Sequence, residues 1–112
     1  MGVTIYHNPK CSKSRQTLAL LEENGVKPEI VLYLDNPPTP DEFKGLLKKL
    51  GLKAADLLRS AEAKDAGLTK DMAEDALVKG MLANPRCIQR PIVVKGAKAV
   101  LGRPPENVLD LV

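Results

Sequence analysis

Tryptophan is absent from this sequence of 112 residues, and aromatic residues make up only 3% of it. A hydrophobic core must therefore be built from leucine, valine, isoleucine and alanine, which dominate the 44% of hydrophobic residues. So few aromatic side chains also argue against a surface on which nucleic-acid bases stack. The formal net charge of +3 is too small to indicate a nucleic-acid partner. The composition therefore favours a protein with mixed surface charge and no nucleic-acid partner.

Long apolar runs, a visible signal peptide and clustered cysteines are also missing. No stretch approaches the about 20 apolar residues that a membrane span needs. Two cysteines without a secretory context favour the reducing cytosol over a disulfide scaffold. Together with a single histidine they make no metal site. We therefore expect a cytoplasmic protein without membrane contact, metal or bound cofactor.

The first third of the chain has the pattern of a βαβ unit. Residues 2–7 are predicted to form a strand, residues 12–24 a helix that stops at Gly25, and residues 28–34 a second strand. Residues 30–34 are almost continuously apolar, which is typical of a strand buried on both faces of a parallel sheet.

The rest of the chain reads as a helical block followed by a hairpin and a closing helix. We expect one domain over residues 1–112 with a helical insertion at about 40–84, in which residues 62–70 are ambiguous. The order predicts an α/β fold with a four-stranded mixed sheet flanked by helices. The predicted helices cover residues 40–50, 54–60, 71–83 and 104–111, and the predicted strands cover 91–94 and 99–101.

Cys11 lies directly before the first predicted helix, where backbone N–H groups and the helix dipole favour negative charge. Lys10 and Lys13 flank it, and each of these effects lowers the pKa of a thiol and increases its reactivity. A buried structural cysteine is the alternative. The polar neighbours of Cys11 favour the reactive interpretation.

Two absences near Cys11 narrow the chemistry. Ser14 stands where a dithiol oxidoreductase has its second cysteine, so an intermediate on Cys11 needs another thiol to resolve it. Thr17 stands where a phosphatase-type loop has its arginine, six positions after the cysteine. Any oxyanion at Cys11 must therefore be held by arginines from elsewhere in the chain.

Three arginines are candidates for that role. Arg90 precedes a proline at the start of a predicted strand, and Arg103 lies between a glycine and a proline, so both occupy rigid junctions. Arg59 is the third candidate, and the contribution of Arg15 is left open. A planar guanidinium suits a tetrahedral oxyanion through paired donors. The alternative is that these arginines are solvated surface charges.

Four ordered motifs resemble the glutaredoxin-dependent arsenate reductase family, a branch of the thioredoxin-like superfamily, and the similarity covers essentially the whole chain. They are His7–Arg15 (HNPKCSKSR), Leu57–Arg59 (LLR), Arg90–Val94 (RPIVV) and Leu101–Pro105 (LGRPP). This chain looks like a short member of that family. The resemblance implies a thioredoxin-like βαβ–helical insertion–ββα fold, a cis peptide bond before Pro91, and anion binding by Arg59, Arg90 and Arg103.

The resemblance also implies a reaction in which the Cys11 thiolate attacks arsenate and glutathione and glutaredoxin resolve the adduct, with glutathione as co-substrate. We expect a monomer in which His7, Asn8 and Ser14 surround Cys11, with His7 tuning the thiolate rather than acting as a base. Alternatives are a non-enzymatic redox-responsive adaptor and a glutathione-linked thiol oxidoreductase with another substrate. Cys87 is interpreted as a loop or core thiol, and the alternative is a thiol that resolves Cys11.

Overall fold

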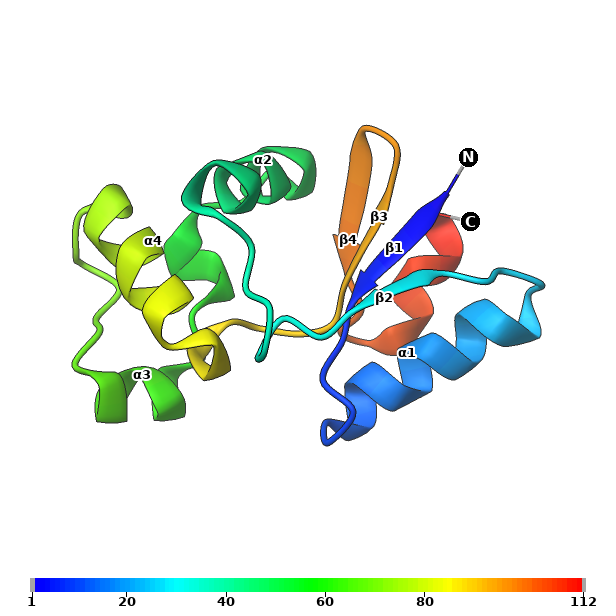
Figure 1. Ribbon diagram of the computed structural model, residues 1–112, viewed down its shortest axis with the longest axis horizontal. Coiled ribbons are helices and arrows are strands. Elements are labelled where there is room, and N and C mark those ends of the chain that lie inside the picture. The colour runs from blue at the N-terminus through cyan, green and yellow to red at the C-terminus, as the bar shows by residue number, and fades with distance from the viewer. Residues whose placement is uncertain (1, 112) are drawn as a thin grey trace. The chain divides into compact units, whose positions relative to one another are not determined.

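The computed structural model describes residues 2–111 (Figure 1). The chain folds into two compact units. The α/β unit comprises Met1–Asn36 and Arg90–Val112, and the helical unit comprises Pro37–Gln89. Within residues 2–111, no helix has both the length and the apolar character needed to cross a membrane.

A four-stranded mixed sheet forms the centre of the α/β unit, with strand order β2-β1-β3-β4. The strand β1 runs parallel to β2, with Ile5 opposite Ile30, and antiparallel to β3, with Ile5 opposite Val93. The α/β class and the mixed sheet predicted from the sequence are confirmed. The strands are β1 (Val3–Tyr6), β2 (Glu29–Val31), β3 (Ile92–Lys95) and β4 (Lys98–Leu101).

The expectation of a second strand buried on both faces is wrong. The strand β2 has only three residues and lies at the edge of the sheet, where Ile30 is 48% exposed. The chain then turns, with the amide of Asp35 donating to the carbonyl of Leu32 at 3.1 Å. Tyr33 is buried in this turn rather than in a strand. A run of apolar residues therefore does not reveal whether both faces of a strand are covered.

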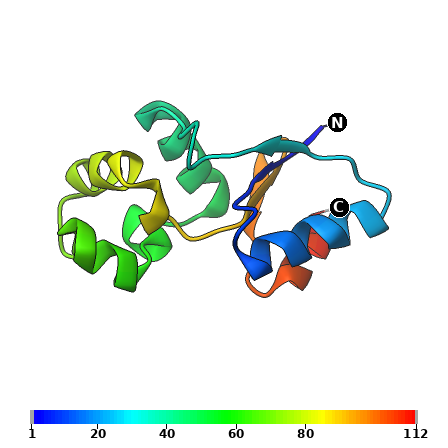
Figure 2. The same cartoon turned by 60° about the horizontal axis from the view of Figure 1, so that its bottom comes forward.

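Helix α1 (Ser12–Glu23) packs against the 3-10 helix η3 (Pro105–Asp110), and Figures 1 and 2 show η3 beside α1. Helix α1 ends at Glu23 with Asn24 as its C-cap, one residue earlier than predicted, and Gly25 follows with φ +76°. The closing helix is a 3-10 helix, shorter than the predicted one. The hydrophobic core beneath these helices contains Val3, Ile5, Leu21, Val93, Val108 and Leu111.

The first helix of the helical unit is capped at its N-terminus by two side chains. Thr39 and Glu42 form a capping box, in which the amide of Glu42 donates to Thr39 Oγ1 at 3.2 Å and the amide of Thr39 donates to Glu42 Oε1 at 3.0 Å. The helix boundaries differ from those predicted. The predicted helix at 54–60 is a 3-10 helix that ends at Leu57, residues 62–66 of the ambiguous segment belong to α3, and the predicted helix at 71–83 starts at Glu74. The elements are α2 (Pro40–Leu50), η1 (Ala54–Leu57), α3 (Ser60–Ala66), α4 (Glu74–Ala83) and η2 (Pro85–Cys87).

Candidate active site

A tight loop carries the chain from β1 to the first turn of α1. The amide of His7 donates to the carbonyl of Val31 at 2.9 Å, and the amide of Cys11 donates to the carbonyl of Asn8 at 3.0 Å. Cys11 itself is the extended residue that caps α1, with φ −92° and ψ 123°. Its thiol is partly exposed and lies beside backbone N–H groups of the first helical turn, which have no partner within the helix.

A buried polar network fixes the shape of this loop. The hydroxyl of Ser14, which is fully buried, accepts from the amide of Asn8 at 3.1 Å and lies 2.5 Å from His7 Nδ1. The side chain of Asn8 in turn accepts from the amide of Lys10 at 3.0 Å. Burial, reinforced by the charge of Arg15, lowers the pKa of His7, so the imidazole is neutral at pH 7. These contacts make His7, Asn8 and Ser14 the support of the cysteine loop.

Arg90 and Arg103 both lie in the α/β unit, at the junctions that flank β3 and β4. The Nη2 of Arg103 lies 3.6 Å from the sulfur of Cys11, and its Nε donates to the carbonyl of Arg90 at 2.7 Å. The peptide bond between Arg90 and Pro91 is cis, which confirms the expectation drawn from the family resemblance. The bond between Arg103 and Pro104 is also cis, which the sequence did not suggest.

The environment of Cys11 lowers the pKa of its thiol. Burial acts in the opposite direction and favours the protonated form, but it is outweighed by the backbone N–H of Ser14 and by the side chain and charge of Arg90. The N–H of Lys13 adds to the effect. The sequence pointed to the side-chain charges of Lys10 and Lys13, whereas the charge comes from Arg90 and the contribution of Lys13 from its backbone.

The sequence suggested three further residues for the site, Arg59, Arg15 and Cys87. Arg59 belongs to the helical unit, where it precedes α3 and its Nε donates to Glu62 Oε2 at 2.8 Å, so its predicted contact with the anion stays a prediction. Arg15 is exposed, and its Nη1 donates to the carbonyl of Pro9 at 3.0 Å. Cys87 is unbridged and only 1% exposed, and burial, followed by the charge of Glu62, raises the pKa of its thiol. These properties favour the interpretation of Cys87 as a core thiol.

Sequence reasoning missed a contact between α1 and the end of β4. Thr17 is fully buried, and its Oγ1 lies 3.4 Å from the carbonyl of Gly102, directly before Arg103. The only sequence signal was a threonine on the apolar side of a helix and a glycine next to a candidate arginine. Neither signal indicates that the two residues meet.

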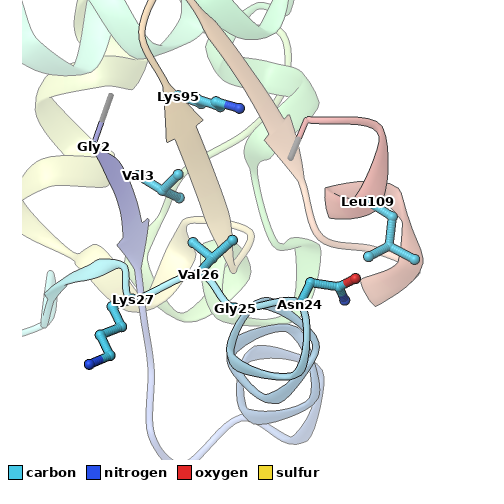
Figure 3. A pocket seen from close by; sticks show the side chains of 8 residues that line it. All are labelled: Gly2, Val3, Asn24, Gly25, Val26, Lys27, Lys95 and Leu109. Carbon is cyan, nitrogen blue, oxygen red and sulfur yellow. The ribbon is translucent and has the colours of Figure 1, made fainter.

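A pocket of about 520 Å³ lies elsewhere on the α/β unit, at the C-terminal end of α1 (Figure 3). Cys11 lies at the N-terminal end of the same helix and does not line this pocket. Within residues 2–111, no group of three or more histidine, cysteine, aspartate or glutamate residues could hold a metal ion. The pocket is lined by Gly2, Val3, Asn24, Gly25, Val26, Lys27, Lys95 and Leu109.

The sheet order, the cysteine at the start of α1 and the cis-proline before β3 define a thioredoxin-like α/β protein with a cysteine directly before its first helix. The chain belongs to the ArsC family, whose model matches residues 6–111. It is similar to the uncharacterized protein YfgD of Escherichia coli (strain K12), at 51% identity over 98% of this chain and 96% of that protein.

Two further relatives carry a named activity. An arsenate reductase of Neisseria meningitidis serogroup A is 44% identical over 95% of this chain and 94% of its own length. The solved structure of an arsenate reductase from Vibrio cholerae is also 44% identical, with a TM-score of 0.90 and coverage of 100% of this chain and 98% of that one.

Proposed function

We propose that this protein is an oxidoreductase that reduces arsenate to arsenite through a covalent adduct on Cys11. The observation that supports this proposal best is a thiol of lowered pKa with a guanidinium nitrogen of Arg103 3.6 Å from its sulfur. Such a pair offers a nucleophile and an anion-binding group at the same place. The names of the relatives at 44% identity supply the substrate.

In the first step, the Cys11 thiolate attacks the arsenic of arsenate. A sulfur–arsenic bond forms and one arsenic–oxygen bond breaks, and the departing oxygen leaves as water after taking up protons from solvent. Arsenic remains in the +5 state, so this step is a substitution and not yet a reduction. The lowered pKa of Cys11 matters here because only the thiolate is an effective nucleophile.

Arginine side chains would hold the oxyanion and stabilise the charge that develops on it. Arg103 and Arg90 are the two candidates in the same unit as Cys11, and the Nε of Arg103 is anchored on the carbonyl of Arg90. A guanidinium anchored in this way can present its remaining N–H groups to a tetrahedral anion without reorganising. Arg59 is proposed as a third anion ligand on the family resemblance alone.

A second thiol must then resolve the adduct, and we propose glutathione. Its thiolate attacks the sulfur of Cys11, so a disulfide forms while the electron pair of the sulfur–arsenic bond stays on arsenic. Arsenic is reduced to the +3 state and leaves as arsenite. A glutaredoxin thiol then accepts the glutathione and restores the Cys11 thiolate. The buried thiol of Cys87, with its raised pKa, is a poor candidate for this task.

The proposal is tested by arsenate-dependent oxidation of NADPH in the presence of glutathione, glutaredoxin and glutathione reductase. We expect turnover with the natural chain and with Cys87→Ala, and none with Cys11→Ser. Arg103→Lys should lower kcat/KM by at least about tenfold because it removes the fork of donors. The control Arg86→Lys, at an exposed arginine of η2 in the helical unit, should not. Turnover that is no faster than that of Cys11→Ser would overturn the proposal. Reduction of a small disulfide by the same sample would then favour glutathione-linked thiol exchange.

A further inference from the structure

Thr17 is a buried polar residue that the proposed reaction leaves without a role. It lies six residues after Cys11 on α1 and is 0% exposed. Its Oγ1 lies 2.8 Å from the carbonyl of Lys13, one turn earlier, and 3.4 Å from the carbonyl of Gly102. The hydroxyl has a single hydrogen, so the two carbonyls share one donor. The contact with the carbonyl of Gly102 ties α1 to the segment that follows β4.

Gly102 meets this threonine without room for a side chain. A Cβ atom at position 102 would lie 2.7 Å from Thr17 Oγ1 and 2.8 Å from Cγ of Pro91. Thr17 and Pro91 are both fully buried, so neither can move aside into solvent. The close approach of helix, proline and backbone therefore requires glycine at this position.

The same contact is adjacent to both arginines of the candidate site. Gly102 is followed by Arg103, Pro91 is preceded by Arg90, and the amide of Gly102 donates to the carbonyl of Pro91 at 2.9 Å. The Nε of Arg103 then bonds the carbonyl of Arg90 at 2.7 Å. Thus α1 carries Cys11 at its start and, through Thr17, rests on the two segments that carry the arginines.

We propose that the contact between Thr17 and Gly102 is a spacer that sets the distance between the Cys11 sulfur and the guanidinium groups of Arg103 and Arg90. Thr17 is then a positioning residue for the oxyanion chemistry, and this role rests on the proposed function. Catalytic groups tolerate little displacement, because a misplacement of about 1 Å can cost about a hundredfold in rate. A buried donor on a rigid helix provides such a constraint.

Three variants test separately the hydrogen-bond donor of Thr17, the shape of its side chain and the lack of space at Gly102. Thr17→Val keeps the shape and removes the donor, Thr17→Ser keeps the donor, and Gly102→Ala adds the atom for which there is no room. We expect Thr17→Val to lower kcat/KM for arsenate by about tenfold and Gly102→Ala by about a hundredfold, on the scale expected for misplaced catalytic groups. Thr17→Ser should stay within about threefold of the natural chain, because one donor suffices for the shared bond. The exposed Thr69→Val is the control substitution.

A second readout does not depend on arsenate. The rate at which iodoacetamide alkylates Cys11, followed by peptide mass spectrometry across a pH series, gives the titration midpoint of its thiol. Displacing guanidinium donors from the sulfur disfavours the thiolate, so the midpoint should move to higher pH in Thr17→Val and Gly102→Ala but not in Thr17→Ser. A purely structural role would change the melting temperature and leave this midpoint where it is.

The outcomes distinguish the two proposals. Natural-chain values of kcat/KM and alkylation midpoint in Thr17→Val would overturn the positioning role, and so would an equal loss in Thr17→Ser. If Thr17→Val fails to fold by circular dichroism, Gly102→Ala tests the same contact from its other side. If the natural chain does not reduce arsenate, the proposed function fails, while the alkylation midpoints still decide whether Thr17 positions the arginines around Cys11.

Discussion

Replacing Ser14 by alanine removes the centre of the polar network beneath the cysteine loop. The Ser14 hydroxyl serves both the amide of Asn8, at 3.1 Å, and Nδ1 of His7, at 2.5 Å. Ser14 is fully buried, and His7 and Asn8 are each only 6% exposed. In Ser14→Ala, water therefore has little access to replace the lost partner. The substitution leaves two buried polar groups without their hydrogen bonds.

The expected loss follows from these two groups. A buried donor or acceptor without a partner costs about 1–3 kcal/mol, so the loss of two such bonds should lower the free energy of unfolding by about 2–6 kcal/mol. This is a large share of the about 5–15 kcal/mol that stabilises a typical domain. For a chain of this length it corresponds to a fall in melting temperature of about 10–25 °C.

Tyrosine fluorescence during urea unfolding is a suitable assay because the chain has no tryptophan and its two tyrosines, Tyr6 and Tyr33, both lie in the α/β unit. The signal therefore reports on the unit that contains Ser14. Ser12→Ala, at an exposed serine of the same helix in the α/β unit, is the matched control and should change the free energy of unfolding by less than about 0.5 kcal/mol. An equally small effect of Ser14→Ala would show that the network does not stabilise the loop.

Further predictions follow from the lowered pKa values and from the capping box. The pH midpoint of Cys11 alkylation should lie below 9.0 and below the midpoint of the same thiol in urea. Arg90→Leu should raise this midpoint, and a midpoint unchanged by that substitution would contradict the role of the arginine. The pKa of folded His7 lies below its ordinary value of 6.5, so unfolding takes up a proton and the urea midpoint should fall as pH drops below about 6.5. The variant His7→Asn should lack that part of the fall, and an identical pH dependence would assign it to other groups. Thr39→Ala should destabilise the helical unit by about 1 kcal/mol, measured by circular dichroism at 222 nm in urea, because it removes the N-cap of α2.

Local signals predicted the elements that are built from contacts between near neighbours. The glycine after Asn24 ends α1 in the left-handed conformation that L side chains avoid. Thr39 and Glu42 interact within one helical turn, so the start of α2 could be predicted to the residue. The position of Cys11 directly before α1 could also be predicted, because the start of that helix is set by residues near it in the chain.

Features that depend on distant partners were predicted less well. The apolar residues around Ile30 suggested a strand buried on both faces, but β2 is a short edge strand in which Ile30 is 48% exposed. The charge that lowers the pKa of Cys11 comes from Arg90, 79 positions away in the chain, and not from the neighbouring lysine side chains. The contact between Thr17 and Gly102 joins residues 85 positions apart, and neither residue shows it by its type.

By itself, the sequence determined the α/β class, the position of the thiol at a helix start and the family to which the chain belongs, because propensities, caps and ordered motifs act over short distances. The sequence named Arg90 and Arg103 as candidates for the site, but only the tertiary structure brought them to the sulfur of Cys11. It also decided which strand is the edge of the sheet and what Thr17 contacts. Those outcomes depend on where the sheet returns β3 and β4 to the start of α1, and distances of 3–4 Å between remote residues follow from packing rather than from residue type.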